Sequence, residues 1–309
     1  MLFPCRLFIL FLFPIKYAAT SLFATIMPKD AAPGTLYIVA TPIGNLEDIT
    51  LRALRVLDEV DLIAAEDTRH TRKLLSRHEI RTPLISYYRE KEMERGTEIV
   101  ARLLEGASVA LVSDAGTPGI SDPGAILVRL ARQAAIPVVP LPGTSALTAA
   151  LSAAGLEQNS FLFLGFPPAQ QSQRQKLLKS LVSCEHPLVF YESPQRITAL
   201  FADALAVLGN RQALWAREMS KSFEELQEGP LADLQARAAD RRNKGESVVV
   251  IHPGVAELPE GDNIEELLRW YRDHSGLSLK DACRRLAVDL GLSRSQIYQQ
   301  ALAMWDRRD

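Results

Sequence analysis

Short apolar runs alternate with amphipathic segments over most of this sequence. Residues 35–40 and 61–65 are nearly continuous apolar runs, the pattern of strands that helices cover on both faces. Residues 49–60, between them, repeat leucine at helical spacing. The alternation of buried strands and amphipathic helices predicts an α/β fold.

The same alternation continues along the chain and divides it into parts. Polarity rises near residues 155–160, where we expect a linker between two α/β domains, residues 34–155 and 160–254. A Pro/Gly/Glu-rich linker over 253–262 then leads to a helical appendage, residues 262–309, that reads as helix, turn, helix. Further strands are expected near 84–88, 110–112, 137–141, 161–166, 188–191, 213–216 and 248–251, and further helices near 92–105, 146–154, 170–182, 194–208 and 230–243.

Residues 1–26 differ from the rest of the sequence. An apolar run over 7–13 follows Arg6, but seven residues are too few to span a bilayer. Met27 offers a second start directly before the α/β pattern. We therefore expect residues 1–26 to be a mis-called start or a disordered leader, with a signal peptide as the alternative.

Composition narrows the class of protein. Of 309 residues, 47% are hydrophobic and 23% charged, which is typical of a globular protein with a real core. The net charge of −2 excludes a protein that coats nucleic acid through bulk charge, so any such binding must use local basic patches. Cys5, Cys184 and Cys283 are far apart, which argues against a disulfide scaffold or a zinc site and favours a reducing cytosol.

The stretch 110–124 carries the strongest signal for a ligand. A buried strand breaks there into a loop of Gly, Pro, Ser, Thr and Asp, with Asp114 and Asp122 as its acids, and a helix follows with Ser121 or Asp122 as its expected cap. Open α/β sheets bind ligands at such strand-to-helix turns. The loop lacks the Lys-Ser/Thr of a P-loop, and no Gly-x-Gly-x-x-Gly occurs in the chain. A binding site is favoured over a plain turn, with its ligand left open.

Seven segments, most of them at strand ends, together resemble one known family. They are residues 40–46, 66–72, 113–124, 142–143, 163–168, 191–196 and 217–225. In this order and spacing they resemble the ribosomal RNA small subunit methyltransferase I family, a branch of the tetrapyrrole-methylase superfamily. The resemblance covers residues 34–254, and the helical tail also fits. Met219 stands where the family more often has Leu.

This resemblance implies a complete activity. It implies methyl transfer from S-adenosylmethionine to the ribose 2′-hydroxyl of a cytidine in the decoding region of 16S ribosomal RNA. It also implies two α/β domains with the cofactor in the cleft between them, a cytoplasmic homodimer, no membrane association and no metal. Carried over by motif, the expected cofactor contacts are Pro42, Asp114, Ala115, Gly116, Thr117, Pro118, Ile120, Ser145, Ala146, Tyr191, Arg217 and Ser247.

A 2′-hydroxyl is a weak acid, so its methylation needs in-line placement and help in losing the proton. The candidate bases are the carboxylates at strand exits: Glu66, Asp67, Asp114 and Glu192. A helix cap or an ion pair is the alternative reading of each. Glu66 is the favoured catalytic residue.

RNA binding requires cations near the cleft. Five basic residues stand in the segment 69–81, four of them on the helix expected after Glu66, against the single acid Glu79, and a solvated helix face is their alternative reading. The first domain would supply Arg69, Arg72, Lys73, Arg77 and Arg81, and the second Arg196, Arg217 and Lys221.

Two other classes of protein compete with this reading. One is a sister methylase that acts on a tetrapyrrole or on a modified protein side chain, which would need neither the basic segment nor the tail. The other is a helix-turn-helix regulator whose α/β body senses a ligand. The tail from residue 262 has eight Lys/Arg and eight Asp/Glu, and this neutrality argues against the regulator.

Overall fold

The computed structural model describes residues 32–156, 158–240, 245–254, 264–290, 294–302 and 305. The expected leader lies outside the described residues. The chain divides into two compact units, the first reaching Pro253 and the second beginning at Gly254. The first unit holds two sheets, each in its own lobe, which we call the first lobe (residues 32–145) and the second lobe (residues 146–253).

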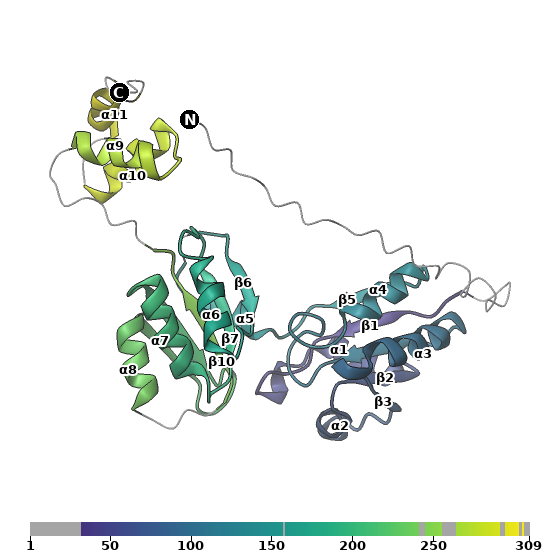
Figure 1. Ribbon diagram of the computed structural model, residues 1–309. Coiled ribbons are helices and arrows are strands. Elements are labelled where there is room, and N and C mark those ends of the chain that lie inside the picture. Colours follow the sequence, from purple (N-terminus) through teal and green to yellow (C-terminus); the bar gives the residue numbers. More distant parts are fainter. Residues whose placement is uncertain are drawn as a thin grey trace. The chain divides into compact units, whose positions relative to one another are not determined.

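The first lobe is built on a five-stranded parallel sheet (Figure 1). Its order is β3-β2-β4-β1-β5, so the strand that feeds the glycine-rich loop lies in the middle. All four residues of β4 are buried, which explains its unbroken apolar sequence. The strands are β1 (Leu36–Val39), β2 (Leu62–Ala65), β3 (Leu84–Ser86), β4 (Val109–Val112) and β5 (Val138–Leu141).

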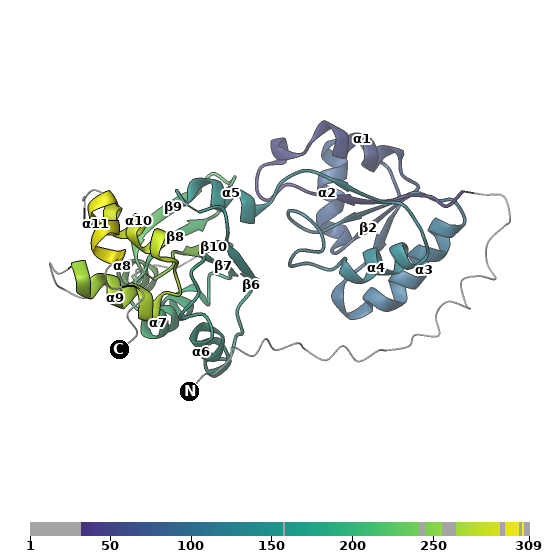
Figure 2. The same cartoon turned by 90° about the horizontal axis from the view of Figure 1, so that it is seen from above.

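Helices cover both faces of this sheet (Figure 2). One face packs against α1 (Leu51–Glu59) and α2 (Thr68–Arg77), and the opposite face packs against α3 (Glu92–Leu104) and α4 (Ala125–Gln133). Two 3-10 turns, η1 (Leu46–Asp48) and η2 (Arg89–Lys91), lie in the connections. The first lobe is therefore a three-layer α/β domain, as the sequence predicts.

The second lobe has a mixed five-stranded sheet in the order β6-β7-β10-β8-β9. Only β6 and β7 are parallel, and the other neighbours are antiparallel. The strand β9 was not predicted, because its sequence contains no apolar run and it forms an edge with no buried residue. The strands are β6 (Leu162–Gly165), β7 (Leu188–Glu192), β8 (Gln212–Arg217), β9 (Glu225–Pro230) and β10 (Ser247–Ile251).

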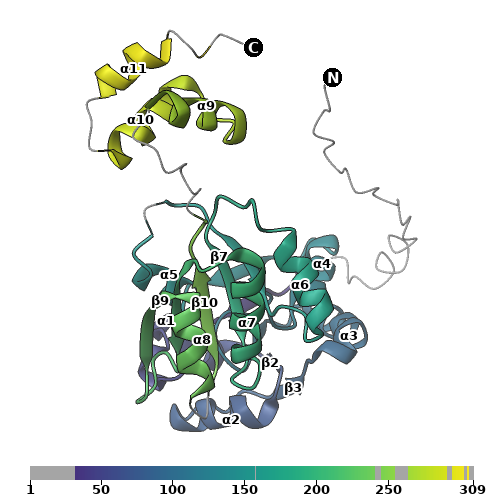
Figure 3. The same ribbon diagram turned by 60° about the vertical axis from the view of Figure 1, so that its left-hand side comes forward.

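Three helices lie side by side on one face of this second sheet (Figure 3). They are α6 (Gln171–Lys179), α7 (Ile197–Leu208) and α8 (Leu231–Ala239), and they enclose a core in which Phe201 meets Trp215 edge to face at 5.4 Å. The opposite face packs against α5 (Ala146–Ala153), with Ala150 in the core. The helix that was expected to close the first domain thus packs on the second sheet.

The second unit is a small helical domain. Its helices are α9 (Ile264–His274), α10 (Leu279–Asp289) and α11 (Arg294–Leu302), and they share a core that includes Leu268, Cys283 and Ile297. Ser278 begins α10 as a cap, because its Oγ accepts from the backbone N–H of Asp281 at 3.2 Å and donates to the Asp281 carboxylate at 2.6 Å. Within the described residues, no helix combines the length and the apolar character that crossing a membrane requires.

Candidate active site

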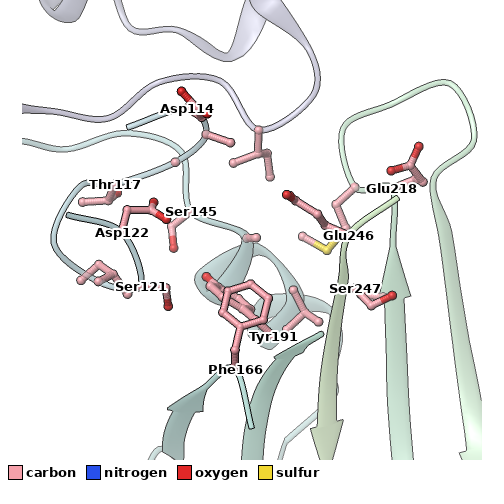
Figure 4. A pocket seen from close by; sticks show the side chains of 18 of the residues that line it. Asp114, Thr117, Ser121, Asp122, Ser145, Phe166, Tyr191, Glu218, Glu246 and Ser247 are labelled. Carbon is pink, nitrogen blue, oxygen red and sulfur yellow. The ribbon is translucent and has the colours of Figure 1, made fainter. Parts of the chain in front are cut away.

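A pocket lies where the carboxyl end of the first sheet faces strands of the second lobe (Figure 4). Its first side consists of the turns that follow β1, β2, β4 and β5, and its second side consists of β7, β8, β10, the residue after β6 and the loop after β8. Carboxyl ends of parallel strands are the usual ligand site of α/β folds. Both lobes therefore contribute to one site.

Hydrogen bonds tie three of the strand-end turns together. The backbone groups of Thr41 and Gly116 exchange two bonds of 2.9 Å, which joins the turn after β1 to the turn after β4. Thr41 Oγ1 also donates to the Ser113 carbonyl at 2.9 Å. Thr144 Oγ1 donates to the Thr41 carbonyl, and Thr117 Oγ1 donates to the Thr144 carbonyl at 3.0 Å. The three turns form one rigid rim.

The loop after β4 departs from the sequence prediction in one respect. Neither Ser121 nor Asp122 caps the next helix, because α4 begins at Ala125 after Gly124, whose φ of 149° favours glycine. The carboxylate of Glu92 accepts instead from the N–H of Gly124 at 2.8 Å. This leaves Asp122 free to line the pocket, and Ser121 Oγ is buried there without a hydrogen-bond partner in the described structure.

Two acidic turns are linked at the carboxyl ends of neighbouring strands. The N–H of Asp67 donates to Asp114 Oδ1 at 3.1 Å, and the N–H of Asp114 donates to Glu66 Oε2 at 3.4 Å. The adjacency of β2 and β4 in the sheet brings these residues together. Glu66 and Asp114 consequently line the pocket, whereas Asp67 caps α2.

The pKa values of two pocket carboxyls are raised. Burial is the main cause for Glu66, and the nearby charges of Asp122 and Asp114 add to it, while an Asp114 backbone hydrogen bond and the Arg89 charge act in the opposite direction. Burial also raises the pKa of Asp122, helped by the charges of Glu246 and Asp114 and opposed by a Ser113 hydrogen bond and by Arg89. Both groups bind protons more readily than an exposed carboxyl does.

Aromatic side chains from the second lobe close the apolar side of the pocket. Tyr191 accepts at its hydroxyl from the N–H of Leu147 at 3.1 Å, which fixes its position on the start of α5. Phe166 packs edge to face on Tyr191 with ring centres 5.6 Å apart, yet it stays half exposed. Ser247 is buried beside them, and its Oγ accepts from Trp215 Nε1 at 3.0 Å.

The loop after β8 belongs to the second lobe and contacts the first lobe. Its backbone is strained, since Glu218 and Ser220 have φ values of 50° and 65°. Ser220 Oγ donates to the Asp48 carboxylate of the first lobe. A Cβ on Gly44 would lie 2.5 Å from Lys221 Cγ and 2.8 Å from the Met219 carbonyl oxygen, so this approach requires glycine. The loop is thereby held over the pocket.

Most of the predicted cofactor residues come together at this pocket. Glu66, the predicted catalytic residue, lines it too. Pro42, Pro118 and Arg217 do not: Pro118 lies in a separate groove, and Arg217 pairs with Glu225 at 3.0 Å beside the Trp215 ring. The predicted cofactor residues that line it are Asp114, Ala115, Gly116, Thr117, Ile120, Ser145, Ala146, Tyr191 and Ser247.

The remaining base candidates lie elsewhere. Asp67 binds Arg69, and the hydrogen bond from that guanidinium lowers the pKa of its carboxyl. Glu192 is buried at the end of β7, where Arg196 pairs with it at 3.0 Å and burial raises its pKa. Each of these two carboxylates is thus a cap or an ion-pair partner, the alternative reading that the sequence left open.

The predicted RNA-binding cations fall into two groups. The exposed side of α2 carries Arg69, Arg72, Lys73 and Arg77, and Arg69 is 86% exposed although it pairs with Asp67. In the second lobe, Arg196 is engaged by Glu192 and the Pro167 carbonyl. Lys221 lines the pocket and pairs with Glu218 at 2.8 Å.

Several lining residues were missed at the sequence level. Phe166, Glu218 and Met219 stand within the quoted motifs, and Asp122 stands within the glycine-rich loop, so a closer reading could have found them. Glu246 had no signal beyond its place before a strand. The missed residues are Ile43, Ser121, Asp122, Phe166, Ala216, Glu218, Met219, Glu246 and Val248.

Fold and pocket together define the class: a two-lobed α/β protein with a pocket between its lobes. The family model of the tetrapyrrole (corrin/porphyrin) methylases matches residues 35–235. Two relatives are named "Ribosomal RNA small subunit methyltransferase I". The protein of Pseudomonas aeruginosa is 46% identical over 275 residues, 87% of this chain and 97% of the relative. That of Halalkalibacterium halodurans is 41% identical over 276 residues, 86% and 93% of the two chains.

Solved structures agree on the fold. Uroporphyrin-III C-methyltransferase from Thermus thermophilus, complexed with S-adenosyl homocysteine, matches with a TM-score of 0.50 at 19% identity, over 71% of this chain and 97% of that one. The chain belongs to the tetrapyrrole methylases and, within them, to the ribosomal RNA small subunit methyltransferase I family.

Proposed function

We propose that this protein transfers a methyl group from S-adenosylmethionine to the ribose 2′-hydroxyl of a cytidine in the decoding region of 16S ribosomal RNA. The observation that carries the proposal is the pocket at the carboxyl end of the first sheet, in a chain that is 41% and 46% identical to two ribosomal RNA methyltransferases over the 276 and 275 aligned residues. As a methyl donor, the cofactor supplies an activated methyl group on a sulfonium cation.

The pocket's residues fit this cofactor. Backbone groups of the rim between Asp114 and Thr117 can hydrogen-bond its polar ends, and the unpartnered Ser121 Oγ offers another polar contact. Phe166 and Tyr191 supply an apolar side that suits a nucleoside. The carboxylates complement its positive charge.

Glu66 is the proposed general base. It lines the pocket, and its pKa is raised by burial and by neighbouring carboxylates, which makes it a better proton acceptor near neutral pH. Asp114 donates its backbone N–H to one Glu66 oxygen and thereby orients the carboxylate. In this scheme Glu66 would take the hydroxyl proton, and the rim would orient the methyl donor toward the hydroxyl oxygen.

The exposed basic face of α2 is the proposed RNA-binding surface of the first lobe. It starts directly after the Glu66 turn, so phosphates bound to it would lie near the pocket. A small macrocycle would make no use of such a face. We further propose that the protein acts in the cytoplasm, where its substrate is assembled, and that it works as a homodimer.

The test is methyl transfer in vitro to small ribosomal subunits, and to their naked RNA, from a strain that lacks this modification. We expect tritium from methyl-labelled S-adenosylmethionine in one nucleotide, which nuclease mapping identifies as a 2′-O-methylcytidine. Label on the base rather than the ribose, or transfer to uroporphyrinogen III but not to RNA, would reject the proposal in favour of a sister methylase.

A further inference from the structure

The charges that line the pocket are strongly unbalanced. Five carboxylates face it against one ammonium, that of Lys221, and Lys221 already pairs with Glu218 at 2.8 Å. In the described part of the chain, the other four carboxylates make no ion pair. These four are Glu66, Asp114, Asp122 and Glu246.

The unpaired carboxylates come from both sides of the pocket. Asp122 extends from the loop after β4, and Glu246 lies opposite it at the start of β10 (Figure 4). The charge of Glu246 is close enough to raise the pKa of Asp122, so the two groups repel each other across the pocket. The charge of Arg89 acts against this repulsion at Asp122, but Arg89 lies outside the pocket lining, where its Nη2 donates to the Ser121 carbonyl at 3.1 Å. A cation between the two carboxylates would relieve this repulsion.

Methyl transfer changes the charge of the cofactor. In the reaction a carbon–oxygen bond forms at the ribose and the carbon–sulfur bond breaks, with its electron pair left on sulfur. The hydroxyl proton leaves to a base. The sulfonium cation of S-adenosylmethionine becomes the neutral thioether of S-adenosylhomocysteine, and no other charge on the cofactor changes. A pocket with a negative potential therefore binds the substrate form more strongly than the product form.

We propose that Asp122 and Glu246 form an electrostatic selector, which retains S-adenosylmethionine through its positive charge and releases S-adenosylhomocysteine once that charge is lost. The inference rests on the proposed function, since it assigns roles within the same cofactor site. It makes these two residues determinants of cofactor specificity rather than of the chemical step. It also explains product release, because the negatively charged pocket no longer attracts the cofactor once its positive charge is lost.

The test compares the affinities of three ligands by titration calorimetry. S-adenosylmethionine and S-adenosylhomocysteine differ in charge at one position, and sinefungin carries a protonated amine where the cofactor carries its methyl group. For Asp122→Asn and Glu246→Gln, we expect the affinity for the two cationic ligands to fall about 3- to 10-fold per substitution, while that for S-adenosylhomocysteine changes less than about twofold. Glu228→Gln, on the exposed edge strand β9, is the matched control and should change none of the three.

A second measurement uses the unaltered protein, so that the proposal can be tested even if the variants fail to fold. Raising the salt concentration should weaken the binding of S-adenosylmethionine and sinefungin more than that of S-adenosylhomocysteine, because salt screens the charges. Equal salt dependence for the three ligands, or equal losses of affinity in the variants, would overturn the selector while leaving the proposed function intact. Absence of S-adenosylmethionine binding to the unaltered protein would instead overturn the proposed function.

Discussion

At the residue scale, the pocket depends on carboxylates that the fold keeps partly buried and close to one another. The negative charge of Asp114 acts on both Glu66 and Asp122. Burial and this repulsion raise the pKa values of both carboxyls. Functional sites commonly place titratable groups in such surroundings. The activity of this site should therefore depend on pH and on each of these carboxylates.

Replacing Glu66 by Gln should lower the turnover rate by about 10²–10⁴-fold, since a positioned base contributes about this much. In the unaltered enzyme the base must be deprotonated, so the rate should rise with pH through the pKa of Glu66 and level off above it. Because that pKa is raised, this limb should lie above the ordinary range of a glutamate. Single-turnover rates as a function of pH measure both effects. An unchanged acidic limb in the variant would show that another group is the base.

Gly124 provides a residue-scale test of the rim. Its φ of 149° is strained for any other residue, and a Cβ there would crowd Leu111 Cδ2 at 3.0 Å and the Gly119 nitrogen at 3.1 Å. We expect Gly124→Ala to destabilise the fold by about 1–3 kcal/mol, the cost of a strained backbone and local crowding. Urea unfolding measures it. Full stability would mean that the loop adapts freely and that the rim is not rigid.

The pocket's residues were predictable to different degrees. The motif residues at strand ends, such as Gly116 and Tyr191, could be found because parallel strands deliver their carboxyl ends to one edge. Glu246 could not, since nothing local shows that β10 begins beside the loop that follows β4 in the other lobe. Ser121 or Asp122 is the cap that the sequence predicts, but Gly124 precedes α4, and its N–H donates to Glu92 at the start of a distant helix. Long-range contacts of this kind leave no local signal.

At the element scale, the charged side chains of α2 are exposed, whereas those between α6 and α7 are buried and paired. The cations on α2 are exposed and serve no core, which suits a surface that binds phosphates. Arg174 of α6 and Asp203 of α7 are instead 4% and 2% exposed and pair at 2.5 Å. The edge strand β9 illustrates why elements are missed, because its sequence is polar and only its pairing with β8 makes it a strand.

Neutralising Arg69 and Lys73 together should weaken RNA binding and leave S-adenosylmethionine affinity nearly unchanged. Each lost phosphate contact should reduce the slope of log affinity against log salt by about 0.7–0.9, so the pair should change it by about 1.5. Filter binding over a salt series measures the slope. Arg81 lies beyond the end of α2 and should contribute less. An unchanged slope would identify this surface as a solvated helix face.

Removing the buried charge of Asp203 by Asp203→Ala should cost about 3–5 kcal/mol, because Arg174 would remain buried without a partner. Burial alone would raise the pKa of Asp203, but hydrogen bonds from Gln171, Gln175 and Arg174 outweigh it and lower the pKa. This stability is therefore present above the ordinary aspartate pKa and is lost as the pH falls through the lowered value. Denaturant unfolding at several pH values measures it. Glu98→Ala, which breaks exposed pairs, should cost about 1 kcal/mol or less.

At the scale of the whole molecule, the site exists only because two lobes meet. The first lobe contributes the rim and most of the carboxylates, and the second contributes the aromatic side and the loop after β8. The α/β pattern predicted both lobes, since long periodic segments carry their own signal. The packing of α5 on the second sheet was not predictable, because a helix of small apolar residues matches either neighbour.

The contact between Gly44 and the loop after β8 tests this dependence on both lobes. Gly44→Ala would place a Cβ within 3 Å of Lys221 and Met219, and we expect it to push the loop away and weaken S-adenosylmethionine binding by about tenfold. Gly155→Ala is the control, because its Cβ would meet nothing within 4 Å and it adds only the strain of a positive φ. Calorimetry gives both affinities. Equal affinity in the Gly44 variant would contradict a closed arrangement of the lobes.

The most direct test of the central claim is mass mapping of 16S ribosomal RNA from a strain in which this gene is deleted, with and without a plasmid copy. We expect the deletion to remove one ribose methyl group from a single decoding-region cytidine. The RNA fragment that contains this cytidine should then be lighter by the mass of one CH₂. The plasmid copy should restore it, and the Glu66→Gln copy should not. An unchanged methylation pattern in the deletion strain would contradict the account.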